Sequence, residues 1–296
     1  MRALTPPVVE GLTDAFKAQA LFLVEALMQC DSIAAVRDCA EVSPLSVFPD
    51  AVGIAAGERE KLLVYGTMVF NALGPDNALR RESLAKAGEM VPWITGRCDR
   101  AALVGPGFGE TIYRAADDGE ITYPEAALLV RSLLSAGVDT TVAAIGAGLR
   151  FFSENPSEWT RLREQPELMR NAFEEILRLA SPVHAFFRTA ALDTKIDGVE
   201  IREGEKVMRV LGAANADPIK WSDPQRFDIT RKLTGHLEFG AGIHACVGQH
   251  VARKDAEVLF GALAASVKRI EPLGPARWWP DNALRTLDFA PLRFVS

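Results

Sequence analysis

Apolar residues recur at helical spacing through the first two-thirds of the chain. In residues 8–29, the apolar side chains of Phe16, Ala20, Leu23 and Leu27 fall on one stripe. The same spacing predicts helices over residues 32–42 (ending before Pro44), 57–73, 77–97, 123 to about 154, and 167–180. Residues 123–154 are apolar on most sides, so we expect one long helix buried through the middle of the molecule.

The pattern changes after residue 187. Short apolar runs alternate with Asp-Gly and Glu-Gly turns over residues 188–215, which predicts small strands and hairpins around 187–212. A proline-punctuated coil follows over 217–230, and the tail, 286–296, is expected to be extended. No internal repeat or linker interrupts the chain. The predicted fold is mainly α with small β-sheets, in a single domain over residues 1–296.

Composition narrows the function classes. The chain has 296 residues and a net charge of −6, which does not favour bulk nucleic-acid binding. Its most apolar stretches are broken by Glu25 and Arg131 and are too short and charged to span a bilayer. The N-terminus carries no cleavage signal, and we expect a cytoplasmic protein that contacts no membrane. The four cysteines are far apart and lack C-x-x-C spacing, which argues against a zinc site, an iron–sulfur cluster or a disulfide framework.

One cysteine lies in an unusual setting. The stretch EFGAGIHACVGQHVAR, residues 238–253, surrounds Cys246 with Gly240, Gly242 and Gly248 just before a helical pattern. Backbone N–H groups at a helix start favour a thiolate, so this placement predicts a lowered pKa for the Cys246 thiol. Such a thiolate is a nucleophile or a metal ligand. The alternative is a buried inert cysteine, which remains our interpretation of Cys30, Cys39 and Cys98.

Two further groups of polar residues lie on predicted helices. SAGVDTT places Gly137, Asp139 and Thr140 inside the long apolar helix, where a glycine costs about 1 kcal/mol relative to alanine. A helix kink with a solvated aspartate is the alternative to a functional group. EEILR places Glu175 and Arg178 at i and i+3, the spacing of an ion pair.

Together these features resemble the cytochrome P450 family. FGAGIHACVG is similar to the haem-ligand loop of that family at Phe239, Gly240, Gly242, His244, Cys246 and Gly248. EILR resembles its E-x-x-R helix, and AGVDTT resembles its oxygen-binding helix. PQRF, residues 224–227, resembles the meander element whose arginine, here Arg226, joins the Glu–Arg pair. The resemblance covers essentially the whole chain in the same order.

The resemblance implies a haem-thiolate monooxygenase. Cys246 would be the axial thiolate ligand of haem b (iron protoporphyrin IX), with Arg188 and His244 holding the haem propionates. Thr140 would hydrogen-bond the activated oxygen and Asp139 would relay protons to it. Glu175, Arg178 and Arg226 would be structural. From charge pattern alone, an ordinary surface arginine and a loop histidine are the alternatives for Arg188 and His244.

The expected substrate is a small aromatic acid. Arg131, Ser132, Ser135, Asp139 and Thr140 are expected near one helical stripe, where an arginine and two serines could bind an anion. LLVRSLLSAG and neighbouring stretches resemble the bacterial branch that oxidises para-substituted aromatic acids. That resemblance implies an apolar slot lined by Phe70, Leu73, Val183 and Phe186, and hydroxylation or O-demethylation of the substrate. The alternative is a surface Arg131 with serines bonded to backbone carbonyls.

The same resemblance implies external partners. One atom of O2 enters the substrate, and two electrons come from a ferredoxin and a ferredoxin reductase. A basic group on the cysteine face, Arg231, Lys232, Arg253 and Lys254, could attract an acidic partner, or could be a solvated rim.

The chain matches the family only from the end of the family's third major helix. Roughly a quarter of a typical member, with the fold's N-terminal strands and first helices, has no counterpart. We expect the strands around 187–212 to expose an edge in consequence. The alternative function is therefore a truncated, catalytically incompetent remnant with weak or no haem binding. A peroxide-driven peroxygenase is a third hypothesis, which the Asp139–Thr140 pair disfavours.

Overall fold

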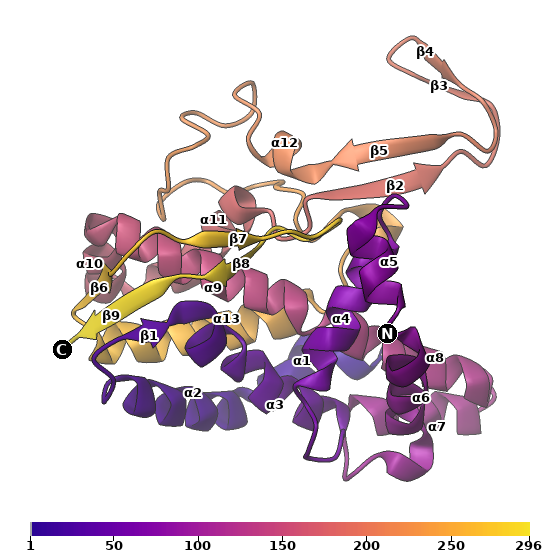
Figure 1. Ribbon diagram of the computed structural model, residues 1–296, viewed down its shortest axis with the longest axis horizontal. Helices are drawn as coiled ribbons and strands as arrows, with labels where there is room; N and C mark the ends of the chain where they lie inside the picture. Colours follow the sequence, from indigo (N-terminus) through magenta and orange to yellow (C-terminus); the bar gives the residue numbers. More distant parts are fainter. Residues whose placement is uncertain (1) are drawn as a thin grey trace.

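Helices make up most of the molecule (Figure 1). The computed structural model describes residues 2–296. The helices from the N-terminus to the middle of the chain are η1 (Arg2–Leu4), α1 (Pro6–Glu10), α2 (Thr13–Leu27), η2 (Ala35–Ala40), α3 (Val42–Val52), α4 (Lys61–Ala72), α5 (Ala78–Leu84), α6 (Ala87–Cys98), η3 (Arg100–Ala102), α7 (Phe108–Asp117) and α8 (Tyr123–Ala136). Those that follow are α9 (Asp139–Glu154), α10 (Pro156–Glu164), η4 (Pro166–Leu168), α11 (Met169–Ala180), α12 (Leu211–Asn215), η5 (Gly242–His244) and α13 (Gln249–Ser266). The predicted class, mainly α with small β-sheets, is confirmed.

Small antiparallel sheets complete the fold. One sheet has the order β1-β9-β6, and three strand pairs are β2–β5, β3–β4 and β7–β8. The strands are β1 (Ile33–Ala34), β2 (Ala185–Thr189), β3 (Thr194–Ile196), β4 (Val199–Ile201), β5 (Lys206–Val210), β6 (Arg269–Pro272), β7 (Arg277–Trp279), β8 (Thr286–Phe289) and β9 (Pro291–Val295). The hairpins predicted around 187–212 and the extended tail are both present.

The predicted end of a helix at Pro44 is wrong. Pro44 lies in the first turn of α3, and α3 continues past Pro49 to Val52. A proline is tolerated in a first turn because its missing N–H would have no partner within the helix. The helix predicted from 77 to 97 is two helices, α5 and α6, that meet at Ala85 and Lys86.

The long central helix is also divided. We predicted one helix from Tyr123 to about Glu154, but α8 ends at Ala136 and α9 begins at Asp139. A Cβ added to Gly137 would lie 2.2 Å from the Phe48 ring of α3, so only a glycine allows the ring this close. The hydroxyls of Thr140 and Thr141 donate to the carbonyls of Ala136 and Gly137 at 2.8 and 3.3 Å, which satisfies backbone groups at the bend.

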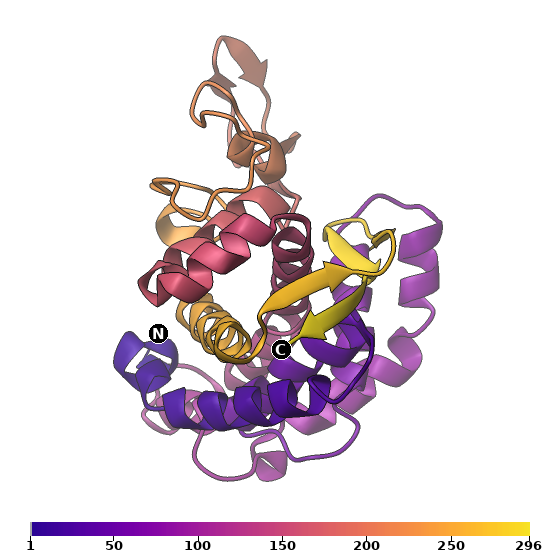
Figure 2. The same ribbon diagram turned by 90° about the vertical axis from the view of Figure 1, so that its left-hand side faces the viewer.

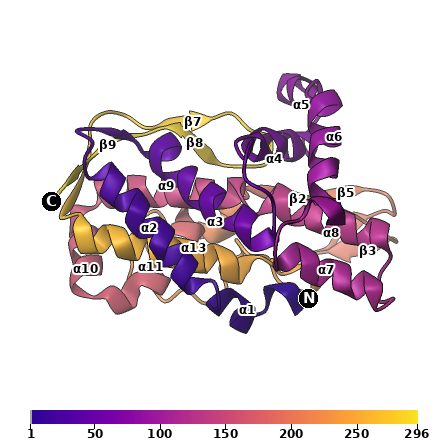
Figure 3. The ribbon, with the colours of Figure 1, turned by 90° about the horizontal axis from the view of Figure 1, so that it is seen from below.

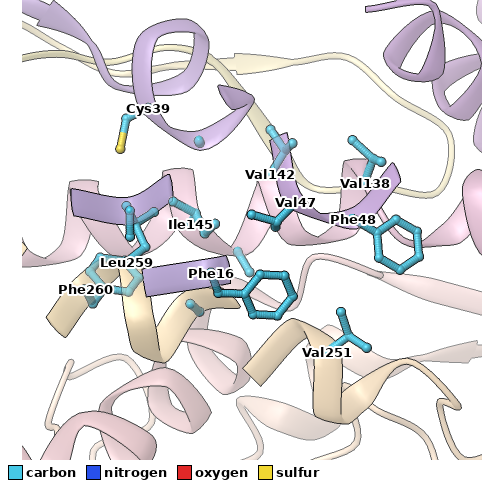
Figure 4. Packing of buried hydrophobic residues seen from close by; sticks show 14 of the residues in the cluster. Phe16, Cys39, Val47, Phe48, Val138, Val142, Ile145, Val251, Leu259 and Phe260 are labelled. Carbon is cyan, nitrogen blue, oxygen red and sulfur yellow. The ribbon is translucent and has the colours of Figure 1, made fainter. Parts of the chain in front are cut away.

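α9 is the centre of the core. Its buried residues pack against α11, α13, η2 and the strands β6 and β8. Figure 4 shows Ile145 of α9 among Phe16 of α2, Val47 of α3 and Leu259 of α13. α2 packs along α13, as the view from below shows (Figure 3). The stretch 123–154 is long and apolar enough to cross a membrane by length and composition, but this burial explains its apolar character.

The β2–β5 pair lies apart from that core. The β3–β4 hairpin extends the pair away from the body of the molecule (Figure 2). Within residues 2–296 neither β2 nor β5 pairs with a further strand, as expected for the strands around 187–212. Phe187 and Met208, which are opposite each other in register, remain exposed at 45% and 53%.

Candidate functional site

The Cys246 loop, residues 238–248, joins the coil that follows α12 to α13. Gly240 and Gly242 adopt left-handed backbone angles, with φ of 68° and 66°, which side chains rarely tolerate. The backbone N–H of Cys246 donates to the Phe239 carbonyl at 2.7 Å and closes the loop. Gly248 is the N-cap of α13, so Cys246 lies at the start of that helix.

The electrostatics of the thiol differ from our prediction. Burial raises the pKa of the Cys246 thiol above its usual value, although the N–H groups of Gly248 and Gln249 and the charge of Arg253 oppose this effect. The predicted lowering is therefore wrong for the thiol, because desolvation outweighs the helix terminus. A coordinated metal ion would reverse this balance, since a thiol that binds a metal loses its proton.

A cavity of about 600 Å³ separates the Cys246 loop from the α8–α9 bend. Cys246, Phe239 and Val251 contribute to the wall formed by the loop and α13. Ala136 and Thr140 contribute to the opposite wall. The lining is mainly apolar, so the sulfur and the Thr140 hydroxyl are polar groups in a space of low dielectric constant.

This donor set fits haem. Metal sites built only from protein side chains usually need three or four ligands. Among the residues that the structure describes, no three His, Cys, Asp or Glu side chains cluster as such ligands. A single sulfur beside a large apolar cavity suits a metal whose other ligands belong to a macrocycle. Cys246 could therefore hold haem iron from one side.

Thr140 and Asp139 diverge in the structure. Thr140 lines the cavity, but the Asp139 carboxylate points to α4, where a Cβ added to Gly66 would overlap its Oδ2 at 1.6 Å. Successive residues of a helix differ by about 100° around its axis, so both cannot face the cavity equally. Asp139 Oδ2 is buried without a hydrogen-bond partner. Burial, with smaller effects of Asp281 and Glu41, raises the pKa of Asp139 well above its usual value.

The Glu–Arg pair is buried and fully bonded. Arg178 donates to both carboxylate oxygens of Glu175, at 2.7 and 2.9 Å, and neither side chain is exposed. Arg178 also donates to the carbonyls of Asn215 and Pro224, which fixes the meander coil. The prediction that Arg226 joins this pair is wrong. Arg231 takes that place, with its Nε 3.1 Å from Glu175 Oε1, because the coil turns after Arg226 and presents the later arginine.

The structure does not bring Arg188 and His244 to the cavity. Arg188 lies on β2 and donates to the Phe187 carbonyl at 2.9 Å. His244 is exposed in the short helix η5. Neither residue lines the cavity, and their role toward the haem propionates stays a prediction.

The predicted substrate stripe is corrected. Ser132 lines the cavity, whereas Arg131 and Ser135 do not. Arg131 acts electrostatically on Tyr65 and Cys98, on the side of α8 that faces α4 and α6. Arg131 and Thr140 are nine positions apart, which is two and a half turns even in an unbroken helix, and α8 ends between them, so one stripe does not carry both residues.

Three of the four predicted slot residues do meet. Phe70, Val183 and Phe186 pack together in a small apolar cluster with Leu211 and Leu284. These side chains pack against one another, and they do not line the cavity at Cys246. Leu73, the fourth, is 52% exposed at the end of α4 and is not part of the cluster.

Three of the four residues in the predicted basic group form ion pairs with carboxylates. Arg231 binds Glu175, Arg253 binds Glu174, and Lys254 lies 2.9 Å from Glu10. Of the four residues, only Lys232 makes no ion pair within residues 2–296. Sequence reasoning missed Glu174 and His236, which lie beside the Cys246 loop, and Glu238, its first residue, because no spacing rule joins them along the chain.

Known proteins resemble this chain in sequence and fold. The sequence model of the family described as Cytochrome P450 matches residues 110–264. Cytochrome P450 CYP199A2 of Rhodopseudomonas palustris is 47% identical over 99% of this chain and 72% of its own length. Cytochrome P450 107B1 of Saccharopolyspora erythraea is 32% identical over 99% of this chain and 73% of its own length.

Solved structures share the whole arrangement. P450BioI, in complex with an acyl carrier protein ligated to hexadec-9Z-enoic acid, superposes with a TM-score of 0.90 at 28% identity and covers 99% of this chain and 77% of its own. Cytochrome P450 CREJ, in complex with (4-ethylphenyl) dihydrogen phosphate, gives a TM-score of 0.91 at 26% identity, over 99% of this chain and 75% of its own.

Proposed function

This chain belongs to the cytochrome P450 family and is a haem-thiolate monooxygenase, and from that premise we propose that it hydroxylates or O-demethylates a small aromatic carboxylic acid. The observation that carries the proposal is the apolar cavity with the Cys246 sulfur on one wall and Thr140 on the other. The 47% identity to CYP199A2 supports our placement of this chain in the bacterial branch that oxidises para-substituted aromatic acids. CREJ, whose structure holds a para-substituted aromatic ring with an anionic group, supports this kind of ligand within the fold.

Haem b is the cofactor, and the Cys246 thiolate would hold its iron. When bound, haem b accepts electrons and activates O2, which the side chains of this cavity cannot do. The N–H groups of Gly248 and Gln249 point to the Cys246 sulfur and share its negative charge once the thiolate forms. The apolar lining limits access of water.

Thr140 and Asp139 provide hydroxyl and carboxyl groups for proton transfer. The Thr140 hydroxyl holds its proton toward the Ala136 carbonyl, which leaves its oxygen free to accept a hydrogen bond from the cavity. Burial raises the pKa of Asp139 well above its usual value, which favours the protonated carboxyl. We keep Asp139 as the proton source and Thr140 as the group that orients a proton within the cavity.

Ser132 is the substrate-binding residue that we retain on α8. Its hydroxyl donates to the Leu128 carbonyl at 2.8 Å and can turn to a substrate carboxylate. Binding of 4-methoxybenzoate should therefore be tighter than binding of its methyl ester, and Ser132→Ala should reduce that preference. Equal affinities for acid and ester would contradict the carboxylate site.

Enzymes of this family use O2 and electrons from a redox partner. We propose a ferredoxin and its reductase as the donors. The cysteine face presents Ile243, which is 97% exposed, and we place the exposed Lys232 on the same face. We also propose that residues 1–296 act as a single domain in the cytoplasm.

The deciding experiment is the carbon-monoxide spectrum of the reduced, haem-loaded chain. We expect a strongly red-shifted Soret band, typical of a thiolate ligand, and its loss in Cys246→Ala. A wild-type chain that takes up no haem would instead support the alternative, a non-catalytic member.

A further inference from the structure

Glu174 on α11 joins the two sides of the Cys246 loop. Its Oε2 lies 2.6 Å from His236 Nε2, and its two oxygens accept from the Arg253 guanidinium, with Nη2 at 3.3 Å. His236 precedes the loop, and Arg253 follows it on α13. The three side chains are only 13%, 7% and 15% exposed. We call these three residues the Glu174 clamp.

The clamp contacts the loop through Phe239. The Arg253 guanidinium lies over the Phe239 ring, 4.4 Å from its centre, and the centre of the His236 ring lies 6.3 Å from that of Phe239. The Phe239 carbonyl accepts the backbone N–H of Cys246. A continuous series of contacts therefore leads from Glu174 through Phe239 to the Cys246 backbone.

Two more contacts tighten this arrangement. Arg253 Nη1 donates to Gln249 Oε1 at 2.8 Å, in the first turn of α13 beside the sulfur. The N–H of Glu238 donates to His236 Nδ1 at 3.4 Å. Charge-assisted bonds between largely buried groups are stronger than those between exposed groups. Although burial raises it, hydrogen bonds from His236 and Arg253 lower the pKa of Glu174 to about 2.

We propose that Glu174, His236 and Arg253 are positioning residues that hold the Cys246 loop ready to ligate haem iron, an inference that rests on the haem-thiolate function above. Arg253 has a second effect, because its positive charge stabilises the thiolate form of Cys246. The Arg253 guanidinium binds the Glu174 carboxylate and lies over the Phe239 ring. It is therefore not a free cation for docking a redox partner. Residues that support metal ligands typically change metal affinity by about 10–100-fold when replaced.

The first measurement is haem binding by the full chain. Glu174→Gln should lower haem affinity about tenfold or more and reduce the share of the red-shifted Soret band in the reduced carbon-monoxide complex. The matched control is Glu167→Gln, which changes an exposed carboxylate in η4. Arg253→Lys should retain more of the band than Arg253→Gln, because lysine keeps the charge and loses the planar fork.

The second measurement needs no haem. In a Cys30→Ser background, Cys246 is the cysteine open to iodoacetamide at about pH 8, because burial raises the pKa of Cys39 and Cys98 to about 12. Glu174→Gln should increase the alkylation rate of Cys246 about threefold or more as the loop opens locally. Glu167→Gln should leave the rate unchanged.

These results separate the two proposals. A wild-type chain without haem would contradict the proposed function, while the alkylation rates would still test the clamp. A Glu174→Gln chain that is less stable to urea, yet keeps control values of haem affinity and alkylation, would show a merely structural residue and overturn the inference. If Glu174→Gln fails to fold, Arg253→Lys and His236→Gln are tested in the same two assays.

Discussion

Arg231, and not Arg226, completes the buried ion pair of Glu175 and Arg178. Arg231 bonds Glu175 and three backbone carbonyls, those of Ser222, Asp223 and Arg226. In contrast, the Arg226 side chain makes no bond to Glu175. The sequence places both arginines near the pair, and only the turn of the coil selects between them. That turn depends on contacts with α11, which no local pattern contains.

Replacement of each arginine should therefore have a different effect. Arg231→Ala should lower the free energy of unfolding by about 3–5 kcal/mol, because it leaves part of the buried Glu175 charge without a partner. Arg226→Ala should change it by no more than about 0.5 kcal/mol. Urea unfolding of both variants measures the difference. Equal losses would contradict the observed pairing.

Glu238 makes the stability of the molecule depend on pH between about 4.5 and 8. Its Oε1 accepts from the Val183 N–H at 2.7 Å, its Oε2 has no partner, and burial raises its pKa from 4.5 to about 8. The protonated carboxyl therefore contributes stability that is complete below about pH 4.5 and is lost as pH rises to about 8.

Glu238→Gln should remove that dependence. The free energy of unfolding of the variant should rise relative to that of the wild type between pH 4.5 and pH 8, by up to about 5 kcal/mol at 1.36 kcal/mol per pKa unit. Urea unfolding at about pH 5 and about pH 9 measures it, with Glu200→Gln on the exposed strand β4 as the control. Parallel pH curves for variant and wild type would rule out the buried acid.

At the level of elements, the bend between α8 and α9 shapes the cavity. Periodicity predicted the helical residues of this stretch, and Gly137, Asp139 and Thr140 indicated an unfavourable point, with a kink as one interpretation. It did not predict a break, because the Phe48 ring that requires Gly137 comes from α3. The stripe from Arg131 to Thr140 was wrong for a related reason: steps that each look small add up to half a turn over nine residues.

The bend can be tested with two glycines. Gly137→Ala should lower the free energy of unfolding by about 1–3 kcal/mol, because the overlap with Phe48 exceeds the gain in helix propensity. Gly261→Ala on α13 meets nothing within 4 Å and should instead raise it by about 0.5–1 kcal/mol. Thermal unfolding of both variants measures the sign of each change in the free energy of unfolding. A stabilised Gly137→Ala would mean that the ring moves away freely.

For the whole molecule, the fold divides into a packed helical body and a lightly attached β region. The helical body and the Cys246 loop could be predicted from the sequence, because apolar periodicity and glycine positions are local. The partners of Arg231, Arg253 and Glu174 could not, because they are set by how distant elements pack. The exposed edge of β2–β5 was predicted and is present.

That edge should promote association. An open strand pair with exposed Phe187 and Met208 offers backbone groups and apolar surface to a second copy. Met208→Lys should shift light-scattering masses toward the monomer, whereas Ile219→Lys, at a 94% exposed position outside the strands, should not. A wild type that stays monomeric at high concentration would contradict this expectation.

The projecting hairpin also offers an engineering site. Asp197 and Gly198 form its turn with φ of 47° and 84°, and β3 and β4 are exposed along nearly their whole length. A fluorophore or an affinity peptide inserted there would extend into solvent. Ligand entry could then be followed by energy transfer between that reporter and the coloured cofactor, without alteration of any residue of the cavity.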